Sequence, residues 1–365
     1  MKVTRREIMQ AIGASALLAP TAPAAQQKAV WPPAESGAPK ICLGVRPDAD
    51  AAGMRRIKQI GVDYVLMGGP PIPWTEAVLR ERMDRFKAGG LTICNMMISG
   101  FPKTLYGRPG RDEEIEKVNA SIRAAGKAGL PVVEYNFYAH RIVEGYYEEL
   151  GRAGAGLTAF DYDRIKDLPP LPEEGAHTLE EMWANAAYFL KAIIPVAEQA
   201  GVRMALHPND PPAPISRGSG QIMSTLAGWK RLVEIVKSPA NGITFDCGVT
   251  RELGEDPVAV ARYFGARDCI NHVHYRNVIV RKPYEKYTEV FLDEGQVDML
   301  AVMKELVRQK YTRGLYPEHP RALDYDRERE GGIVGTYAKV GGGGFAGEIY
   351  NVGYTRAMLQ AALSR

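Results

Sequence analysis

Two histidines and an arginine stand at alternate positions in the segment INHVHYRN, residues 270–277. Side chains at alternate positions of a β-strand point to the same face, so His272, His274 and Arg276 would share one side of the chain. Imidazole nitrogens bind divalent metals, and a guanidinium group can hold a carboxylate. Taken alone, the segment is more typical of a polar strand end whose histidines are satisfied by hydrogen bonds. The rest of the chain must decide between the two interpretations.

Good metal ligands recur at the ends of four consecutive strand-like segments. They are His207 in MALHPND, Asp246 in TFDCG, His274 in HVHYRN, and Glu318, followed by His319, in YPEHPR. The chain has 6 histidines in all, so this recurrence is hard to attribute to chance. A set of two imidazoles and two carboxylates favours Mn²⁺, Fe²⁺, Co²⁺ or Zn²⁺ and tolerates Mg²⁺. The sequence therefore predicts a metal site.

Two neighbours of these ligands need separate interpretation. His272 would lie one layer deeper in its strand than His274, which favours a structural role. Cys247 follows Asp246 directly, and adjacent strand residues face opposite sides, so only one of the two can reach a given face. We expect Asp246 to be the ligand, because this choice leaves Phe245 and Cys247 facing apolar surroundings. Cys247 is the alternative ligand, and its thiolate would favour softer metals.

The elements that would hold this site follow from the periodicity of the chain. Short β-rich runs alternate with amphipathic helical patterns. The runs are residues 41–45, 62–68, 91–98, 131–137, 202–208, 242–248, 270–277 and 314–319. This alternation predicts one (β/α)₈ TIM barrel over residues 41–365, with its chemistry at the C-terminal ends of the strands. A doubly wound open sheet is the alternative, but no glycine-rich fingerprint follows the first strand.

The first 25 residues have the plan of a cleavable export signal. They combine a basic start, a short apolar stretch and small residues near Ala24 and Ala25. The pair Arg5-Arg6 resembles the twin-arginine motif, which predicts a periplasmic location. Residues 26–40 form a Pro-rich linker. Cargo of the twin-arginine route typically crosses the membrane folded, which suits a protein that takes up its metal in the cytoplasm; an uncleaved amphipathic N-terminus is the alternative.

Composition excludes several classes of function. The chain of 365 residues is 45% hydrophobic and 24% charged, with a net charge of +3. It has no cluster of basic residues, which a nucleic-acid-binding surface would require. The apolar run in the signal is short for a membrane span, and we expect no membrane association after cleavage. The 4 cysteines are not closely spaced and are expected to be buried thiols. The sequence leaves the oligomeric state open, a homo-oligomer included.

Several motifs together resemble the mannonate dehydratase family, within the xylose-isomerase-like superfamily. The two most specific are MALHPNDPP and HVHYRNV. The others are GVRPDAD, GKAGLPVVEYNF, LTAFDYD, ITFDCG, DEGQVDMLAVMKEL, YPEHPR and GFAGEIYNVGYTRAMLQA. The resemblance implies a TIM barrel that uses a divalent metal, typically Mn²⁺ or Fe²⁺. It also implies a small sugar acid as substrate, with D-mannonate converted to 2-keto-3-deoxy-D-gluconate and water.

The resemblance carries over to individual residues with some departures. The family's metal ligands would fall on His207, Asp246, His274 and Glu318. The family usually has cysteine at the position of Asp246, when Gly248 is aligned with the family's glycine, and aspartate at the position of Glu318. Its histidine after that acid is kept as His319, and its early arginine as Arg46. A family tyrosine near the C-terminus is Phe345 here, and a nearby arginine is Glu348. An export signal is a further departure, because the relatives are normally cytoplasmic.

Dehydration of a sugar acid places clear demands on a site. It removes the proton α to the carboxylate and expels the β-hydroxyl, so it needs a base, an acid and a cation that stabilises the developing enediolate. His319 is our first choice for one proton transfer, with metal-bound water, Tyr135 or Tyr350 for the other.

Three residues at strand ends are candidates for binding the substrate. Arg46 and Arg276 could clamp a carboxylate, although for Arg276 a salt bridge within the barrel mouth is equally expected. Asn136 could hydrogen-bond a sugar hydroxyl.

Two other functions fit the same residues. Asp246 and Glu318 make the ligand set richer in oxygen, as in barrels of the xylose-isomerase type. A sugar isomerase or epimerase, or a keto-sugar lyase, is therefore the second hypothesis. A non-catalytic periplasmic sugar-acid binder is the third, and it is disfavoured because a binder need not retain four metal ligands.

Export can be tested through the arginine pair. Changing both Arg5 and Arg6 to Lys should leave the full-length protein in the cytoplasm, because the twin-arginine route requires the guanidinium pair. Cell fractionation and mass spectrometry of the mature N-terminus would measure this, with cleavage expected near Ala24 or Ala25. Unchanged periplasmic delivery of the double-Lys variant would show that another route is used.

Overall fold

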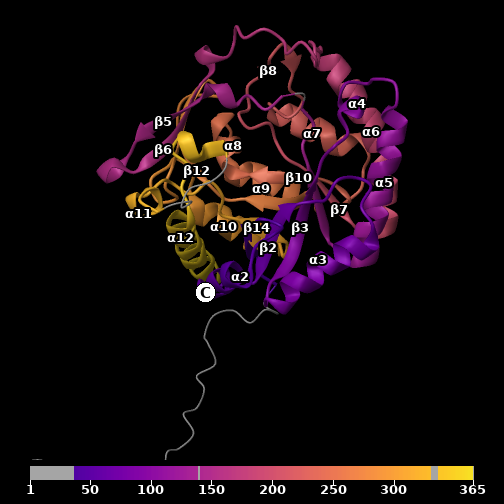
Figure 1. Ribbon diagram of the computed structural model, residues 1–365. Helices are drawn as coiled ribbons and strands as arrows, with labels where there is room; N and C mark the ends of the chain where they lie inside the picture. Colours follow the sequence, from indigo (N-terminus) through magenta and orange to yellow (C-terminus); the bar gives the residue numbers. More distant parts are fainter. Residues whose placement is uncertain (1–36, 139, 330–335, 365) are drawn as a thin grey trace, which may run out of the picture. The chain divides into compact units, whose positions relative to one another are not determined.

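The computed structural model describes residues 37–138, 140–329 and 336–364, and a closed barrel of parallel strands forms its centre (Figure 1). In chain order the barrel strands are β1 (Lys40–Gly44), β2 (Tyr64–Gly68), β3 (Thr92–Ile98), β4 (Val132–Tyr135), β7 (Arg203–Leu206), β10 (Asn241–Asp246), β11 (Ile270–His274) and β14 (Gly314–Tyr316). β14 pairs with β1 to close the barrel. The predicted (β/α)₈ fold is confirmed, with a strand in each of the predicted segments. The predicted signal peptide and most of the linker lie outside the described residues.

Helices lie around the outside of the barrel (Figure 1). They are α2 (Ala51–Gln59), α3 (Glu76–Ala88), α4 (Pro102–Leu105), α5 (Arg111–Ala128), α6 (Leu179–Ala200), α7 (Leu226–Ile235), α8 (Cys247–Glu252), α9 (Pro257–Gly265), α10 (Met299–Arg308), α11 (Asp324–Arg327) and α12 (Phe345–Leu363). Short 3₁₀ turns occur at Val143–Gly145, Arg152–Gly154, Tyr162–Arg164 and Thr336–Lys339. No helix in the described part of the chain is both long and apolar enough to cross a membrane.

Local sequence explains where the longest of these helices begins. Thr178 caps α6 and accepts a hydrogen bond from the backbone of Glu181, whose side chain bonds back to Thr178. This reciprocal pair satisfies backbone donors that the first turn would leave free. The apolar face of α6 buries Phe189 against Tyr135 of the barrel wall. Outward-facing side chains of the barrel strands are thus buried against the helices. The inward-facing side chains are the ones that can form the site.

A second, antiparallel sheet was not predicted. It runs in the order β12 (Asn277–Lys282), β13 (Lys286–Val290), β6 (Gly156–Asp161) and β5 (Tyr146–Leu150). Its strands come from two separate connections, one after β4 and one after β11, and Figure 1 shows β5, β6 and β12 together beside the barrel. A hairpin of β8 (Ile215–Ser216) and β9 (Ser219–Gly220) completes the strands. The antiparallel sheet brings side chains to the mouth that the barrel strands do not supply.

Candidate metal centre and active site

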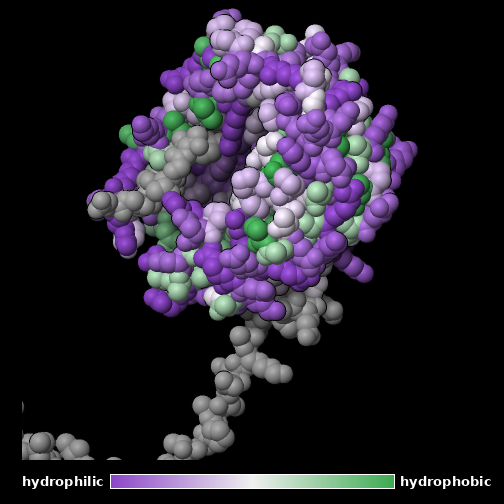
Figure 2. Space-filling model, turned by 45° about the vertical axis from the view of Figure 1, so that its right-hand side comes forward, coloured by the Kyte–Doolittle hydropathy of each residue, from purple (hydrophilic) through white to green (hydrophobic). Residues whose placement is uncertain are grey.

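A polar cavity of about 170 Å³ opens at the C-terminal ends of the barrel strands. Its walls include His207, His274, Glu318 and His319 from the ends of three strands. A hollow with hydrophilic walls is also visible on the face of the molecule in Figure 2. The cavity lies where a TIM barrel places its chemistry, beyond the carboxyl ends of the strands.

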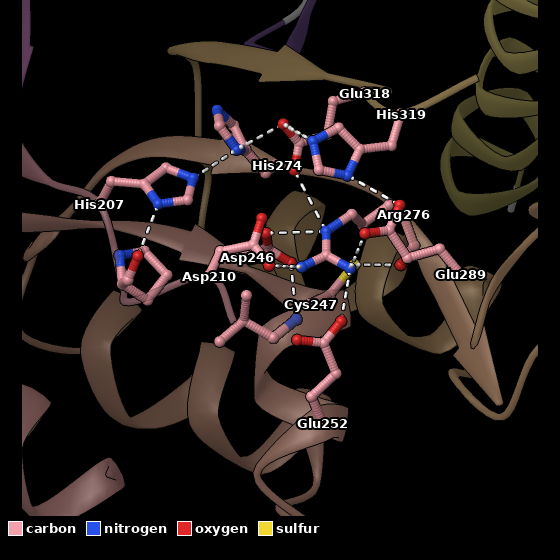
Figure 3. A network of polar contacts seen from close by, with 12 residues as sticks. His207, Asp210, Asp246, Cys247, Glu252, His274, Arg276, Glu289, Glu318 and His319 are labelled. Atoms are coloured by element: carbon pink, nitrogen blue, oxygen red, sulfur yellow. Dashed lines mark hydrogen bonds and ion pairs between the residues drawn. The ribbon is translucent and has the colours of Figure 1, made fainter. Parts of the chain in front are cut away.

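The four predicted ligands converge beneath this cavity (Figure 3). One donor atom from each of His207, Asp246, His274 and Glu318 lies within 4.8 Å of all the others, and all four residues are buried. His207 Nε2 is 3.0 Å from His274 Nδ1, which is 3.0 Å from Glu318 Oε2. Two donors bound at right angles to one ion, each about 2.1 Å from it, lie about 3.0 Å apart. The spacing of these donors therefore fits a single divalent ion.

A hydrogen bond to the backbone prepares His207 for such an ion, and neighbouring acids surround His274. His207 Nδ1 donates to the carbonyl of Pro208 at 2.7 Å, which leaves Nε2 with its lone pair toward the cluster. Burial lowers the pKa of His207 to about 4, so its imidazole is neutral. Burial would also lower the pKa of His274, but Glu318 and Glu134 outweigh it and raise that pKa to about 9.

Glu134 supports His274 from below and was missed by sequence reasoning. Its Oε1 is 3.5 Å from His274 Nε2, while its two oxygens accept hydrogen bonds from Asn95 and Thr244 at 2.7 Å. A carboxylate behind a histidine fixes which ring nitrogen faces the metal. The sequence did contain a sign of this position, because Glu134 lies two residues before the inward-facing Asn136 and alternate strand residues share a face. A charged residue inside an apolar strand could have been recognised as a candidate for the site.

Asp246, rather than Cys247, faces the other ligands. Asp246 caps α8 by accepting from the backbone of Val249 at 2.8 Å, and its second oxygen accepts from Arg276 Nε at 3.0 Å. Cys247 is the first residue of α8, and its Sγ donates to the carbonyl of Arg276 at 3.2 Å. Burial raises the pKa of the Cys247 thiol, which disfavours a thiolate. Thr244, one layer below, points into the barrel toward Glu134, as expected if Asp246 points inward.

Arg276 is enclosed by acids and does not clamp a substrate in this arrangement. It is 2% exposed and lies off the cavity wall. Its Nε is 3.0 Å from Asp246 and 3.2 Å from Glu318, and its Nη1 is 2.6 Å from Glu252. Of the two interpretations given for Arg276, the structure has the salt bridge. Burial raises the pKa of Asp246 to about 7, although the guanidinium opposes that shift.

Both tyrosines predicted to transfer protons lie away from the cavity. Tyr135 follows the inward-facing Glu134, so it faces outward and packs against Phe189 of α6 at 5.8 Å. Tyr350 lies on α12, where its ring packs against Phe291 at 5.3 Å. Neither lines the cavity that holds the ligands, so the structure does not bring these two predicted residues to the site.

The remaining predicted residues divide between two places. Asn136 lines the ligand cavity, and His272 is fully buried one layer below His274, where burial lowers its pKa to about 4. Arg46 is 75% exposed, pairs with Asp48 and lines another cavity of about 790 Å³. Phe345 and Glu348 line that second cavity too.

The structure adds residues to the ligand cavity that the sequence did not single out. Tyr138 and Arg141, from the connection after β4, both line it. Arg141 Nη2 is 3.2 Å from Asp210, which is buried and also accepts from Tyr146 at 2.8 Å. Burial raises the pKa of Tyr138, with Arg141 opposing the shift, so this phenol keeps its proton. These residues follow the strand end by a few positions, in a loop that periodicity does not describe.

His319 is held at the edge of the cluster. Its Nδ1 is 2.9 Å from Glu289 of β13, and its Nε2 is 3.5 Å from Glu318 Oε2. Burial would lower the pKa of His319, but the carboxylates of Glu289 and Glu318 outweigh it and raise the pKa. His319 is therefore placed to exchange a proton with a molecule in the cavity.

Comparisons with known proteins point in one direction. Residues 176–351 match the family model described as D-mannonate dehydratase (UxuA). The chain is 33% identical to a mannonate dehydratase of Streptococcus equi subsp. zooepidemicus over 82% of this chain and 91% of that one. The crystal structure of mannonate dehydratase from Streptococcus suis superposes with a TM-score of 0.78 at 28% identity, covering 89% of this chain and 95% of that one.

A more distant likeness is confined to the fold. A D-psicose 3-epimerase of Clostridium cellulolyticum superposes with a TM-score of 0.56 at 14% identity over 88% of this chain and 98% of that one.

Metal binding can be tested at the histidines. His207→Ala or His274→Ala should reduce the bound metal from about one ion per chain to a trace, because each removes a donor from the cluster. Elemental analysis after dialysis, with calorimetric titration, measures this. His272→Ala is the control, and it should lower the free energy of unfolding by about 1–3 kcal/mol while the metal stays bound. Metal retained by both ligand variants would place the site elsewhere.

A second pair of variants separates Asp246 from Cys247. Asp246→Asn keeps the cap on α8 but loses the charge, so the dissociation constant for the ion should rise at least about 100-fold, or about 2.7 kcal/mol. Cys247→Ser should bind the ion nearly as tightly as the parent. The assignment is wrong if the serine variant loses the ion and the asparagine variant keeps it.

Proposed function

The chain belongs to the mannonate dehydratase family, and on this premise we propose that it is a lyase that converts D-mannonate to 2-keto-3-deoxy-D-gluconate and water. One observation carries the proposal: the residues at the family's metal-ligand positions converge in one buried cluster beneath a cavity at the barrel mouth. A carbohydrate-sized acid needs such a cavity, with a cation and proton-transfer groups on its walls.

The family is metal-dependent, and His207, Asp246, His274 and Glu318 would hold the ion. When bound, a divalent cation supplies positive charge that stabilises the enediolate formed from the substrate. Two imidazoles and two carboxylates suit Mn²⁺ or Fe²⁺, which we propose as the resident metals.

Two cavity residues have the chemistry for the proton transfers. We assign His319 as the base that removes the proton at C2, because its Nε2 is directed toward Glu318 and the cavity. We assign Tyr138 as the acid that protonates the departing C3 hydroxyl, since its phenol lines the same cavity and its pKa is raised. The C2–H and C3–O bonds break, an enol and water form, and the enol takes a proton at C3 to give the 2-keto acid.

Recognition of the substrate falls to the loop after β4. Arg141 and Asn136 both line the cavity, and a guanidinium suits the carboxylate of a sugar acid while an amide suits a hydroxyl. We propose that Arg141 takes the role first assigned to Arg276.

A second candidate function rests on the ligand types. Asp246 and Glu318 replace the family's usual cysteine and aspartate, and the set becomes richer in oxygen. An isomerase or epimerase, which moves a proton between neighbouring carbons without loss of water, would use a cluster of this kind. The likeness to epimerases supports the fold alone, so this candidate ranks below the dehydratase, and a non-catalytic binder ranks below both.

We also propose that the protein works in the periplasm, exported through the motif at Arg5-Arg6, where it would act on a small sugar acid. This location would make it an exported member of a family whose relatives are normally cytoplasmic.

A mass-spectrometric screen tests the function. The purified protein, loaded with Mn²⁺ and incubated with a panel of aldonic acids and keto-sugars, should convert D-mannonate to a product lighter by one water. Rearrangement without change of mass would favour the isomerase, and binding without turnover would favour the binder.

Removal of one hydroxyl tests the assigned acid. Tyr138→Phe should lower kcat on the order of 100-fold, since a positioned general acid contributes at least that much. Tyr135→Phe is the matched control, because it loses a hydroxyl that is buried away from the cavity, and its kcat should not change. Equal activity of the two variants would remove Tyr138 from the mechanism.

A further inference from the structure

The antiparallel sheet delivers one acid to the edge of the site. Glu289 lies on β13, an inner strand that pairs with β12 on one side and with β6 on the other. Its backbone is therefore held from both sides, opposite Val278 and Thr158. The side chain is 1% exposed. A carboxylate buried to this degree requires partners, and its partners define its role.

One partner of Glu289 is the imidazole of His319. Glu289 Oε2 is 2.9 Å from His319 Nδ1 (Figure 3). A carboxylate accepts and does not donate, so Nδ1 carries the hydrogen in this contact. The other ring nitrogen, Nε2, is then the one turned to Glu318 at 3.5 Å and to the cavity.

Arg321 fixes both members of this pair. Its Nη2 donates to the same oxygen of Glu289 at 2.9 Å, while its Nε and Nη2 donate to the carbonyl of His319 at 2.9 and 2.6 Å. His319 has a backbone φ of 47°, in the left-handed region that costs a non-glycine residue free energy. The hydrogen bonds from Arg321 hold the backbone of His319 in this conformation, which brings its ring to Glu289.

Glu289 is not well placed to bind a second metal ion. Donors of Asp210, Glu289 and His319 do lie within 4.8 Å of one another. However, Arg141 and Tyr146 already contact Asp210, and Arg321 contacts Glu289. These arginines and this tyrosine already compensate the negative charges of the two carboxylates, which a second metal ion would otherwise do. The cluster is therefore held by hydrogen bonds and ion pairs around His319.

We propose that Glu289 is a positioning residue for catalysis: it fixes the tautomer and the orientation of His319, so that Nε2 faces the substrate. The proposal rests on the proposed function of His319 as a base. An acid behind a catalytic histidine holds the correct tautomer and keeps the ring aligned for proton transfer. The antiparallel sheet thus takes part in the reaction through one side chain.

Glu289→Gln tests this with a matched control. The amide retains the shape of the side chain but weakens the acceptor and turns an NH₂ group toward Arg321 or His319. We expect kcat to fall on the order of 100-fold with little change in KM, since the substrate is bound elsewhere. Glu149→Gln, the same change on β5 of the same sheet, alters contacts with Tyr147, Arg281 and Thr288, none of which lines the cavity, and should leave kcat unchanged.

A spectroscopic readout separates positioning from catalysis. In NMR spectra of the Mg²⁺-loaded protein with isotope-labelled histidine, the Nδ1–H proton of His319 should give a downfield resonance. Loss of this resonance in His319→Gln would assign it. Glu289→Gln should shift or abolish that resonance and Glu149→Gln should not. This measurement does not need turnover, so it tests the contact even where the proposed dehydration fails.

The conservative variant completes the test. Glu289→Asp keeps a carboxylate on a shorter side chain, so it should retain the resonance and lose less activity than the glutamine variant. It also serves if the glutamine variant does not fold. The proposal is overturned if Glu289→Gln leaves the His319 resonance unchanged, or if Glu289→Gln lowers kcat no more than Glu149→Gln does.

Discussion

The crowding of carboxylates around one guanidinium is the constraint on which the barrel mouth depends. Arg276 lies within 3.9 Å of acids from the ends of several elements, and Figure 3 shows it at their centre. They are Asp210, Asp246, Glu252, Glu289 and Glu318. Buried like charges repel strongly in a medium of low dielectric, so such a group of acids is stable only around a cation. Arg276 supplies one positive charge from the protein itself, and a divalent ion at the ligands would add two more.

This arrangement explains which parts of the site could be predicted. Ligands at strand ends are set by the barrel, so four residues far apart in the sequence could be placed together from periodicity alone. The inward or outward direction of each strand residue was harder to predict. Strands buried on both faces are apolar throughout, and alternation is then hidden. For this reason the sequence did not show that Tyr135, beside Glu134, packs outward against Phe189, while Asp246 and Cys247 could be separated because only one of them is charged.

Residues outside the barrel repeat could not be placed from the sequence. Glu289 belongs to a sheet assembled from two connections that are far apart in the chain, and no local pattern signals that they meet. Tyr138 and Arg141 follow a strand but lie in its loop, where the position of a side chain depends on tertiary contacts. Tyr350 was a candidate for proton transfer because of its phenol, whereas α12 turns its ring toward Phe291. Long-range contacts of this kind are decided by packing, which sequence spacing does not report.

The aspartate at position 246 is best understood together with its neighbours. Its carboxylate caps α8 at Val249 and contacts Arg276, in addition to facing the other ligands. A cysteine at this position could donate its electron pair to an ion, but its sulfur is a weak hydrogen-bond acceptor and cannot form two such contacts at once. An N-cap is worth about 1 kcal/mol, and a charge-assisted bond to a buried arginine more than a neutral one. Asp246 therefore stabilises the fold of the mouth in addition to its proposed role as a metal ligand. Because a carboxylate is also a harder ligand than a thiolate, the local requirements that select an aspartate here agree with the proposal of Mn²⁺ or Fe²⁺ at this site.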